Sequence, residues 1–98
     1  MKNKEVCKEF IRRRVASGSN LVSTGDKLFS YNTCIAQFNG HTLILNETKY
    51  SVTTSKHQSY LRKAVTDSGI WATTYLVDNI NYNTRDLVEI YERIYRDY

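Results

Sequence analysis

The first segment of the chain has the apolar spacing of an amphipathic helix. From residue 4 to residue 17, apolar side chains recur every three or four positions and would form one stripe along a helix. The members of this stripe are Val6, Cys7, Phe10, Ile11 and Val15. Gly18 is a natural end for the helix, because glycine adopts the left-handed conformation found at many helix C-termini. Residues 19–26 are rich in turn-forming side chains and predict a loop.

The pattern then changes to that of short β-strands. Residues 27–31, 33–38 and 42–46 are rich in β-branched and aromatic side chains. Asn39-Gly40 separates the second run from the third, and this pair favours a hairpin because both residues tolerate positive φ. We expect a further turn to lead into a short strand at residues 50–52, which gives a meander of three or four antiparallel strands.

The second half of the chain predicts two more helices and one more strand. Ser55 begins a capping box, so a helix is expected to run from there to about Thr66 and to stop before Gly69. Residues 70–77 are apolar and rich in strand-forming side chains. A last helix is expected to begin near Thr84. Its apolar stripe consists of Leu87, Val88, Tyr91, Ile94, Tyr95 and Tyr98.

These elements predict one α+β domain over residues 1–98, with an antiparallel sheet of about four strands packed with three helices. The chain has 98 residues, of which 41% are hydrophobic, so it can bury one small core. No apolar run approaches the ~20 residues of a membrane-spanning helix, and the first residues lack the apolar segment of a signal peptide. We therefore expect no membrane contact and a cytoplasmic location.

No group of side chains has the spacing of a catalytic or metal site. His41 and His57 lie sixteen residues apart, without further ligands at the spacing that structural zinc requires. Cys7 and Cys34 have apolar neighbours and are expected to be buried, reduced thiols; a disulfide between them is not required. Ser55 and His57 are explained as a capping residue and a solvent-facing residue at a helix start. The sequence therefore predicts no enzymatic activity, no metal and no cofactor.

The charge pattern makes nucleic acid a candidate partner. The formal net charge is +4 and the sequence pI is about 9.1, which is mildly basic. Two basic clusters fall on predicted helices, where Lys and Arg could hold phosphates. The cations assigned to this interaction are Arg12, Arg13, Arg14, Lys56, Arg62 and Lys63, and the first cluster also contains Lys8. An ordinary solvated helix surface also explains either cluster taken alone.

Two further groups of side chains are candidate contact sites. Tyrosines on and before the last helix would form a protein-contact patch if the apolar stripe of that helix is wider than the hydrophobic core can cover. Tyrosine is enriched at protein interfaces. The members of this patch are Tyr82, Tyr95 and Tyr98. The other group, at the expected start of the middle helix, consists of Thr54, Ser55 and His57. It could accept a phosphate or carboxylate at the helix N-terminus, although capping alone also explains it.

Two stretches of the chain resemble small uncharacterised proteins encoded by bacteriophages and other mobile elements. Residues 28–37 read LFSYNTCIAQ and residues 49–58 read KYSVTTSKHQ, and the shared pattern is SYNTxIA followed by YSxTTSKHQ. The resemblance covers about residues 19–62. It implies a phage or plasmid accessory protein that acts in the cytoplasm of a bacterial host cell, and it brings no established activity or catalytic residues.

Two functions are consistent with these observations. We expect a small non-enzymatic binding protein that occupies a surface of a host protein or ribonucleoprotein complex, and an inhibitor of a host defence system of the anti-CRISPR kind is the concrete form. The alternative is a basic nucleic-acid-binding accessory protein that holds phosphates through the two basic clusters. Salt separates the two hypotheses, since phosphate contacts weaken steeply with salt through counterion release.

Overall fold

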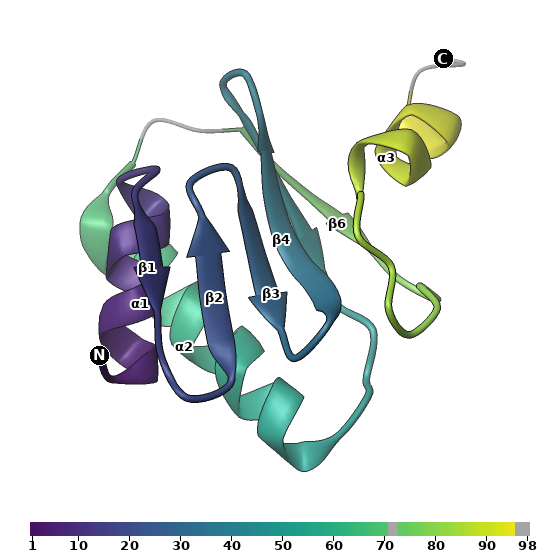
Figure 1. Ribbon diagram of the computed structural model, residues 1–98. Helices are drawn as coiled ribbons and strands as arrows, with labels where there is room; N and C mark the ends of the chain where they lie inside the picture. The colour runs from purple at the N-terminus through teal and green to yellow at the C-terminus, as the bar shows by residue number, and fades with distance from the viewer. Residues whose placement is uncertain (71–72, 96–98) are drawn as a thin grey trace.

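Residues 1–70 and 73–95 are described in the computed structural model, in which helices cover both faces of one β-sheet (Figure 1). The elements are α1 (Asn3–Ile11), β1 (Val15–Ser17), β2 (Leu21–Thr24), β3 (Lys27–Ser30), β4 (Thr33–Asn39), β5 (Thr42–Asn46), α2 (Val52–Ser68), β6 (Thr73–Val77) and α3 (Val88–Tyr95). The six described strands lie in the order β1-β2-β3-β4-β5-β6. β1 to β5 form an antiparallel meander, and β6 is parallel to β5.

The predicted α+β class is confirmed, but the sheet is larger than predicted and it is mixed. The described residues contain three helices, as expected, and six strands where about four antiparallel strands were expected. β6 can run parallel to β5 because α2 connects the two strands, and a parallel pair needs a long crossover of this kind. β6 falls within the strand expected at residues 70–77, of which residues 71–72 lie outside the described part of the chain.

α1 is shorter than its apolar spacing predicted. It ends at Ile11, Arg13 takes a positive φ of 60°, and the chain enters β1 at Val15. The Val15 side chain, expected on the buried stripe of the helix, is 79% exposed, whereas Ala16 is buried. The prediction of a helix to residue 17 is wrong, because this short stretch fits helical spacing and strand alternation alike and its pairing with β2 determines the outcome.

β2 occupies part of the segment that was expected to be a loop. Leu21 and Ser23 are buried at alternate positions, as in a strand with one face on a core. The Ser23 hydroxyl donates to the carbonyl oxygen of Arg14 at 2.7 Å and accepts the N–H of Gly25 at 3.2 Å. The loop prediction is wrong here because a hydrogen-bonded serine fills the buried position. An apolar residue at that position would have given the alternating pattern that predicts a strand.

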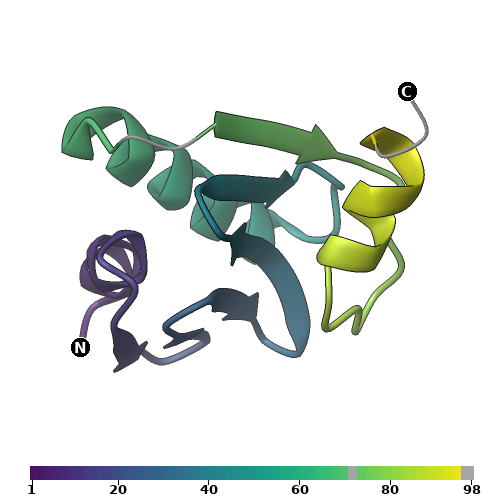
Figure 2. The ribbon, with the colours of Figure 1, turned by 90° about the horizontal axis from the view of Figure 1, so that it is seen from above.

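The predicted hairpin between β4 and β5 is confirmed. Asn39 pairs with Thr42, and Gly40 between them has a φ of 61°. Every residue of β4 from Thr33 to Phe38 is buried, because side chains on both faces of this strand enter a core. One core lies under α1 and α2 and the other lies under α3, on the opposite side of the curved sheet (Figure 2).

α2 begins earlier than predicted and ends where it was expected to. Its N-cap is Ser51, whose hydroxyl accepts the N–H of Thr54 at 3.2 Å, so Ser55 lies inside the helix and is not its cap. The strand expected at residues 50–52 is wrong for the same reason, since Val52 is already helical. Gly69 ends the helix with a φ of 62°, as its position predicted.

α3 begins four residues later than predicted. Asp86 accepts the N–H of Val88 at 2.8 Å and so stabilises the first turn of the helix. Thr84, the expected start, instead donates to the carbonyl oxygen of Asn81 at 2.7 Å within the preceding turn. Tyr98, the last member of the predicted stripe, lies outside the described residues.

Candidate anion-binding groove

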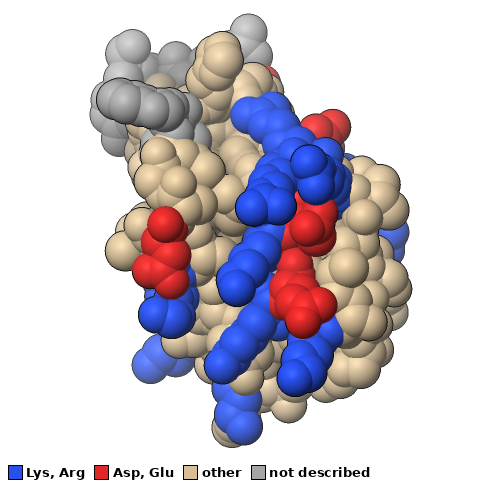
Figure 3. Space-filling view, turned by 90° about the vertical axis from the view of Figure 1, so that its left-hand side faces the viewer, with Lys and Arg blue, Asp and Glu red and all other residues tan. Residues whose placement is uncertain are grey.

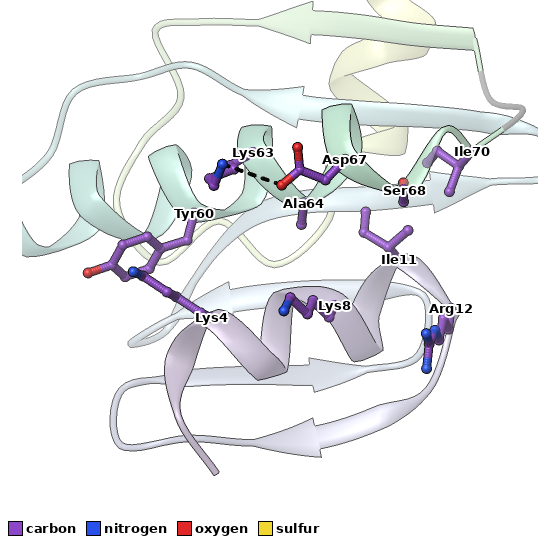
Figure 4. Close-up of a pocket in the computed structure, with 10 residues that line it drawn as sticks. All are labelled: Lys4, Lys8, Ile11, Arg12, Tyr60, Lys63, Ala64, Asp67, Ser68 and Ile70. Atoms are coloured by element: carbon purple, nitrogen blue, oxygen red, sulfur yellow. Dashed lines mark ion pairs between the residues drawn. The ribbon is translucent and has the colours of Figure 1, made fainter.

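A row of three cations extends along α1 at the border with α2 (Figure 4). Lys4 and Lys8 lie one turn apart on α1, and Arg12 is the C-cap residue one turn further on, so the three follow one another along one side at steps of about 6 Å. The apolar side of α1 holds the helix in place, with Val6 and Phe10 fully buried. Because that burial sets the rotation of α1, it also directs the row of cations toward the surface beside α2.

α2 supplies the other wall of a groove whose floor is apolar. Tyr60 and Ala64 lie one helical turn apart, and Ile70 follows the end of the helix. Ile11 of α1 lies across from Ala64, so these apolar side chains lie between the two helices (Figure 4). The groove has a volume of about 550 Å³. That size is in the range of pockets that hold small organic groups, ~300–1,000 Å³.

Positive charge dominates this groove. It is lined by four cationic side chains and by one carboxylate, that of Asp67, which pairs with Lys63 at 3.4 Å. The Lys4 ammonium lies over the ring of Tyr60, 5.3 Å from its centroid. Among residues 1–70 and 73–95, neither Lys8 nor Arg12 forms an ion pair. Lys and Arg side chains form a band on this side of the molecule, with Asp and Glu side chains beside it (Figure 3), and the lining of the groove has more positive than negative side chains, which favours anions.

The structure brings together members of both predicted basic clusters. Lys8 and Arg12 of the first cluster and Lys63 of the second line the groove. Lys4 also lines it and was not among the predicted binding residues. The signal was available, because the four-residue spacing of Lys4, Lys8 and Arg12 marks one face of a helix.

Other members of the first predicted cluster do not line the groove. Arg13 lies over the ring of Phe38, 4.1 Å from its centroid, and donates a hydrogen bond to the carbonyl oxygen of Gly40. Arg14 pairs with Glu9 at 3.6 Å. The first cluster is therefore split, because α1 ends before Arg13 and the chain turns into β1.

The second predicted cluster is split as well. Arg62 points to the β5 side of α2, where it pairs with Glu47 at 3.2 Å. Lys56 is exposed near the start of α2 and does not line the groove. Asp67 lies in the last part of α2 and also lines the groove, so one wall of the groove contains a carboxylate.

The predicted anion site at the start of the middle helix is largely buried. Thr54 is 4% exposed and His57 is 2% exposed, so the expectation that His57 faces solvent is wrong. Ser30 lies 2.7 Å from Nδ1 of His57 and 3.1 Å from the hydroxyl of Thr54. Burial lowers the pKa of His57 below its usual value. Of the three predicted residues, Ser55 is exposed at the helix surface.

A serine beside a histidine is the pairing used in nucleophilic catalysis, but this pair is enclosed. Ser30 is 1% exposed, and the far side of the His57 ring meets the Asn3 amide, with 3.3 Å between Nε2 and Nδ2. A dissolved substrate has no path to the Ser30 hydroxyl in this arrangement. The cluster instead links α1, β3 and α2 through buried polar contacts.

The predicted tyrosine patch is divided between different partners. Tyr82 is 63% exposed, and its ring lies 4.7 Å from that of Tyr50. Tyr95 is half-buried, packs against Tyr75 at 4.7 Å and donates a hydrogen bond to the carbonyl oxygen of Leu76 at 3.0 Å. Tyr98 lies outside the described residues. Tyr82 is thus available for contact, whereas much of Tyr95 is used in holding α3 to β6.

The cysteines do not form a reactive site. Both thiols are free and buried, and burial raises the pKa of Cys7 and of Cys34 to about 12. Cys7 lies in the core under α1, and Cys34 lies in the core under α3. No set of three or more His, Cys, Asp or Glu side chains within residues 1–70 and 73–95 could hold a metal ion.

The comparisons with known proteins assign a family and leave its function open. Neither the curated proteins nor the solved structures that were searched include a match to this chain. Of the helices described, none has the length and apolar character to cross a membrane. A protein-family model does match, over residues 3–72. The matched segment includes every residue that lines the groove and ends before β6 and α3. The chain therefore belongs to DUF8033, a family of unknown function.

Proposed function

We propose that this protein is a non-enzymatic binding protein whose α1–α2 groove holds the phosphates of a nucleic acid. The observation that carries the proposal is the row of Lys4, Lys8 and Arg12, which faces Lys63 across an apolar floor. Phosphate oxygens are the anions that basic side chains most often contact in protein–nucleic acid complexes. Four cations with a single carboxylate would favour such a polyanion over a neutral or cationic partner.

The availability of these cations supports binding over a purely structural role. Lys8 and Arg12 are exposed and have no carboxylate partner among the residues described, so their charge is free to meet an external anion. By contrast, Arg62 and Arg14 already contact carboxylates of the chain itself. The proposed interface is therefore narrower than the two predicted clusters and also includes Lys4.

We also propose that the protein acts in a bacterial host. The resemblance of residues 28–37 and 49–58 to phage and mobile-element proteins supports a phage or plasmid accessory protein that acts in the bacterial cytoplasm. The buried Ser30 hydroxyl and the buried thiols support a protein that acts by binding without catalysis.

A second candidate function is inhibition of a host defence complex by protein contact, as in anti-CRISPR proteins. Its support is the exposure of large apolar side chains around β6 and α3, since such side chains are used in protein interfaces. Tyr82 is 63% exposed, Leu76 is 54% exposed and Ile94 is 41% exposed. This surface lies outside the residues matched by the family, whereas the groove lies inside them.

The test of the first proposal compares two double variants with equal changes in charge. Lys8→Ala with Arg12→Ala removes two groove cations, and Lys49→Ala with Lys56→Ala removes two exposed cations that do not line the groove. Fluorescence anisotropy would measure the Kd for labelled DNA and RNA oligonucleotides between ~50 and ~200 mM salt. The groove variant should lower the slope of log K against log salt by about 2, one unit for each phosphate contact removed.

The control variant should keep the slope of the parent protein. No binding by the parent protein at the lower salt would exclude nucleic acid as the ligand. An equal reduction of the salt slope in both variants would show that net charge, and not the groove, causes the binding. If the parent protein binds no nucleic acid, purification with partners from a bacterial lysate would test the second candidate function.

A further inference from the structure

We infer that the groove binds a single nucleic-acid strand in preference to a duplex and that it receives an unpaired base between α1 and α2. This inference rests on the proposed function and specifies its ligand. The observation behind it is that the cations and the apolar surface lie on different parts of the groove. Lys4, Lys8 and Arg12 follow one rim, and Ile11, Ala64 and Ile70 form the floor (Figure 4).

The cation row fits the backbone of one strand. Lys4 and Lys8 lie on α1 and Arg12 is its C-cap residue, so the three residues follow one another at steps of about 6 Å and span about 12 Å in all. Consecutive phosphates of an extended single strand are separated by a comparable step, so neighbouring cations can meet neighbouring phosphates. A row of this length would follow two or three phosphates on one strand.

The floor fits a base and not a phosphate. Ala64 and Ile70 are half-buried and Ile11 is buried, so the bottom of the groove presents hydrocarbon to whatever fills it. A phosphate would lose its hydration there without gaining a hydrogen bond, which is unfavourable. A base has an apolar face and gains from such contact, but in a duplex both faces are already stacked on neighbouring bases.

Tyr60 provides a ring at the same side of the groove. Its ring is half-buried on α2 and carries the Lys4 ammonium 5.3 Å from its centroid. A phosphate on the rim would attract Lys4 away from the ring and leave the ring open to a base. Tyrosine rings stack on bases of any sequence, so this contact would bring little sequence preference.

Asp67 sets the orientation of the strand across the groove. Its carboxylate lies on the α2 side and pairs with Lys63 at 3.4 Å, so it offsets the charge of Lys63 and this side attracts a phosphate less than the α1 side does. The α1 rim carries three cations and no acidic lining residue. Phosphates are therefore favoured along α1, and the bases then point toward α2, which is the direction of the floor and of Tyr60.

The experiment compares three ligands of ~8 residues, a length typical of the strand that a small single-strand-binding domain covers. They are single-stranded DNA that cannot pair with itself, a blunt two-stranded duplex without a loop or unpaired bases, and a strand of the same phosphate number whose central residues are abasic. Anisotropy would measure the Kd of each ligand at one salt concentration. The single strand should bind at least about tenfold more tightly than the abasic strand, because one stacked base contributes about that much.

Two variants locate the base contact. Tyr60→Ala should lower affinity for the single strand by about tenfold and leave the affinity for the duplex unchanged. Tyr60→Phe keeps the ring and should bind like the parent protein. Thermal melts of both variants check folding, and the abasic comparison stands without any variant if Tyr60→Ala does not fold.

Each other outcome overturns the inference in a recognisable way. Equal affinity for all three ligands, with loss on Lys8→Ala and Arg12→Ala, would refute the base contact while the proposed function survives. The absence of binding to any ligand at ~50 mM salt would refute both. Tighter binding of polyglutamate than of the single strand, at equal charge concentration, would show that an acidic protein segment is the ligand.

Discussion

His57 is buried where three elements meet. Its ring contacts Ser30 of β3 at 2.7 Å and Asn3 of α1 at 3.3 Å, while its backbone belongs to α2. The side chain is 2% exposed, so a charged imidazolium at this place would lose most of its hydration. Burial accordingly lowers the pKa of His57 in the folded protein.

Stability should fall with acidification because of His57. Its pKa in the folded protein lies below the usual value of about 6.5, so the unfolded chain binds the proton more readily. The contribution of the neutral histidine is complete above about pH 6.5 and is lost as the pH falls through the lower pKa of the folded state. Urea unfolding at about pH 7.5 and about pH 5 would show a lower midpoint at the acidic pH.

Two substitutions separate this effect from other titrations. His57→Gln should lower the unfolding free energy at about pH 7.5 by ~1–3 kcal/mol, the cost of disturbing a buried polar contact, and should reduce the pH dependence. His41→Gln, the same substitution at an exposed histidine, is the matched control. A pH dependence that survives in His57→Gln would contradict the assignment.

At the scale of single elements, the start of α2 shows how a local pattern can point to the wrong residue. Ser51 and Ser55 both precede helix-forming residues, and both have a hydroxyl that could cap. In the structure, Ser51 accepts the N–H of Thr54 at 3.2 Å, and the N–H of Ser55 already donates to the carbonyl oxygen of Ser51 at 2.9 Å. The helix therefore begins one turn earlier than Ser55. In this arrangement Thr54 and His57 enter the core beside Ser30.

The two serines should respond differently to the same substitution. Ser51→Ala removes the cap of α2 and should lower the unfolding free energy by about 1 kcal/mol. Ser55→Ala changes an exposed position inside the helix, so it should be neutral or raise the unfolding free energy by a few tenths of a kcal/mol. Urea denaturation of both variants would measure this, and a larger loss in Ser55→Ala would contradict the observed helix start.

At the scale of the whole molecule, the sheet separates two hydrophobic cores. Cys7 packs with Phe10 and Leu61 under α1 and α2, whereas Cys34 packs with Phe29 and Leu87 on the side of α3. Each thiol is closed off from solvent by its own core, which raises its pKa to about 12. Neither core can be opened alone without exposing the sheet that both cores share.

Thiol reactivity would test this arrangement. In the native protein, Ellman's reagent should react slowly with both cysteines, because the thiolate that attacks it is scarce and enclosed. In denaturant without reductant, both thiols should react rapidly, since the structure contains them as free cysteines. A fast-reacting thiol in the native protein would contradict the burial, and the absence of reactive thiols in denaturant would show a disulfide.

The candidate site shows the limit of prediction from local patterns. The basic clusters were visible because charge and helical spacing are properties of neighbouring residues. Which cations share a groove was not visible, since Arg12 and Lys63 are distant in sequence and meet only when α1 packs beside α2. The same packing directs Arg62 away to Glu47, although it stands next to Lys63 in the chain.

The amino-acid sequence alone determined the features that depend on neighbouring residues. These are the α+β class, the Asn39-Gly40 hairpin, the end of α2 at Gly69 and the helical spacing that makes α1 basic on one side. Tertiary structure decided the features that depend on distant partners. They include β1 and β2, whose pairing overrides a helical pattern and a loop pattern, and β6, whose parallel direction requires α2 as a crossover. The groove belongs to the second group, because its two walls are brought together only by burial of the core beneath them.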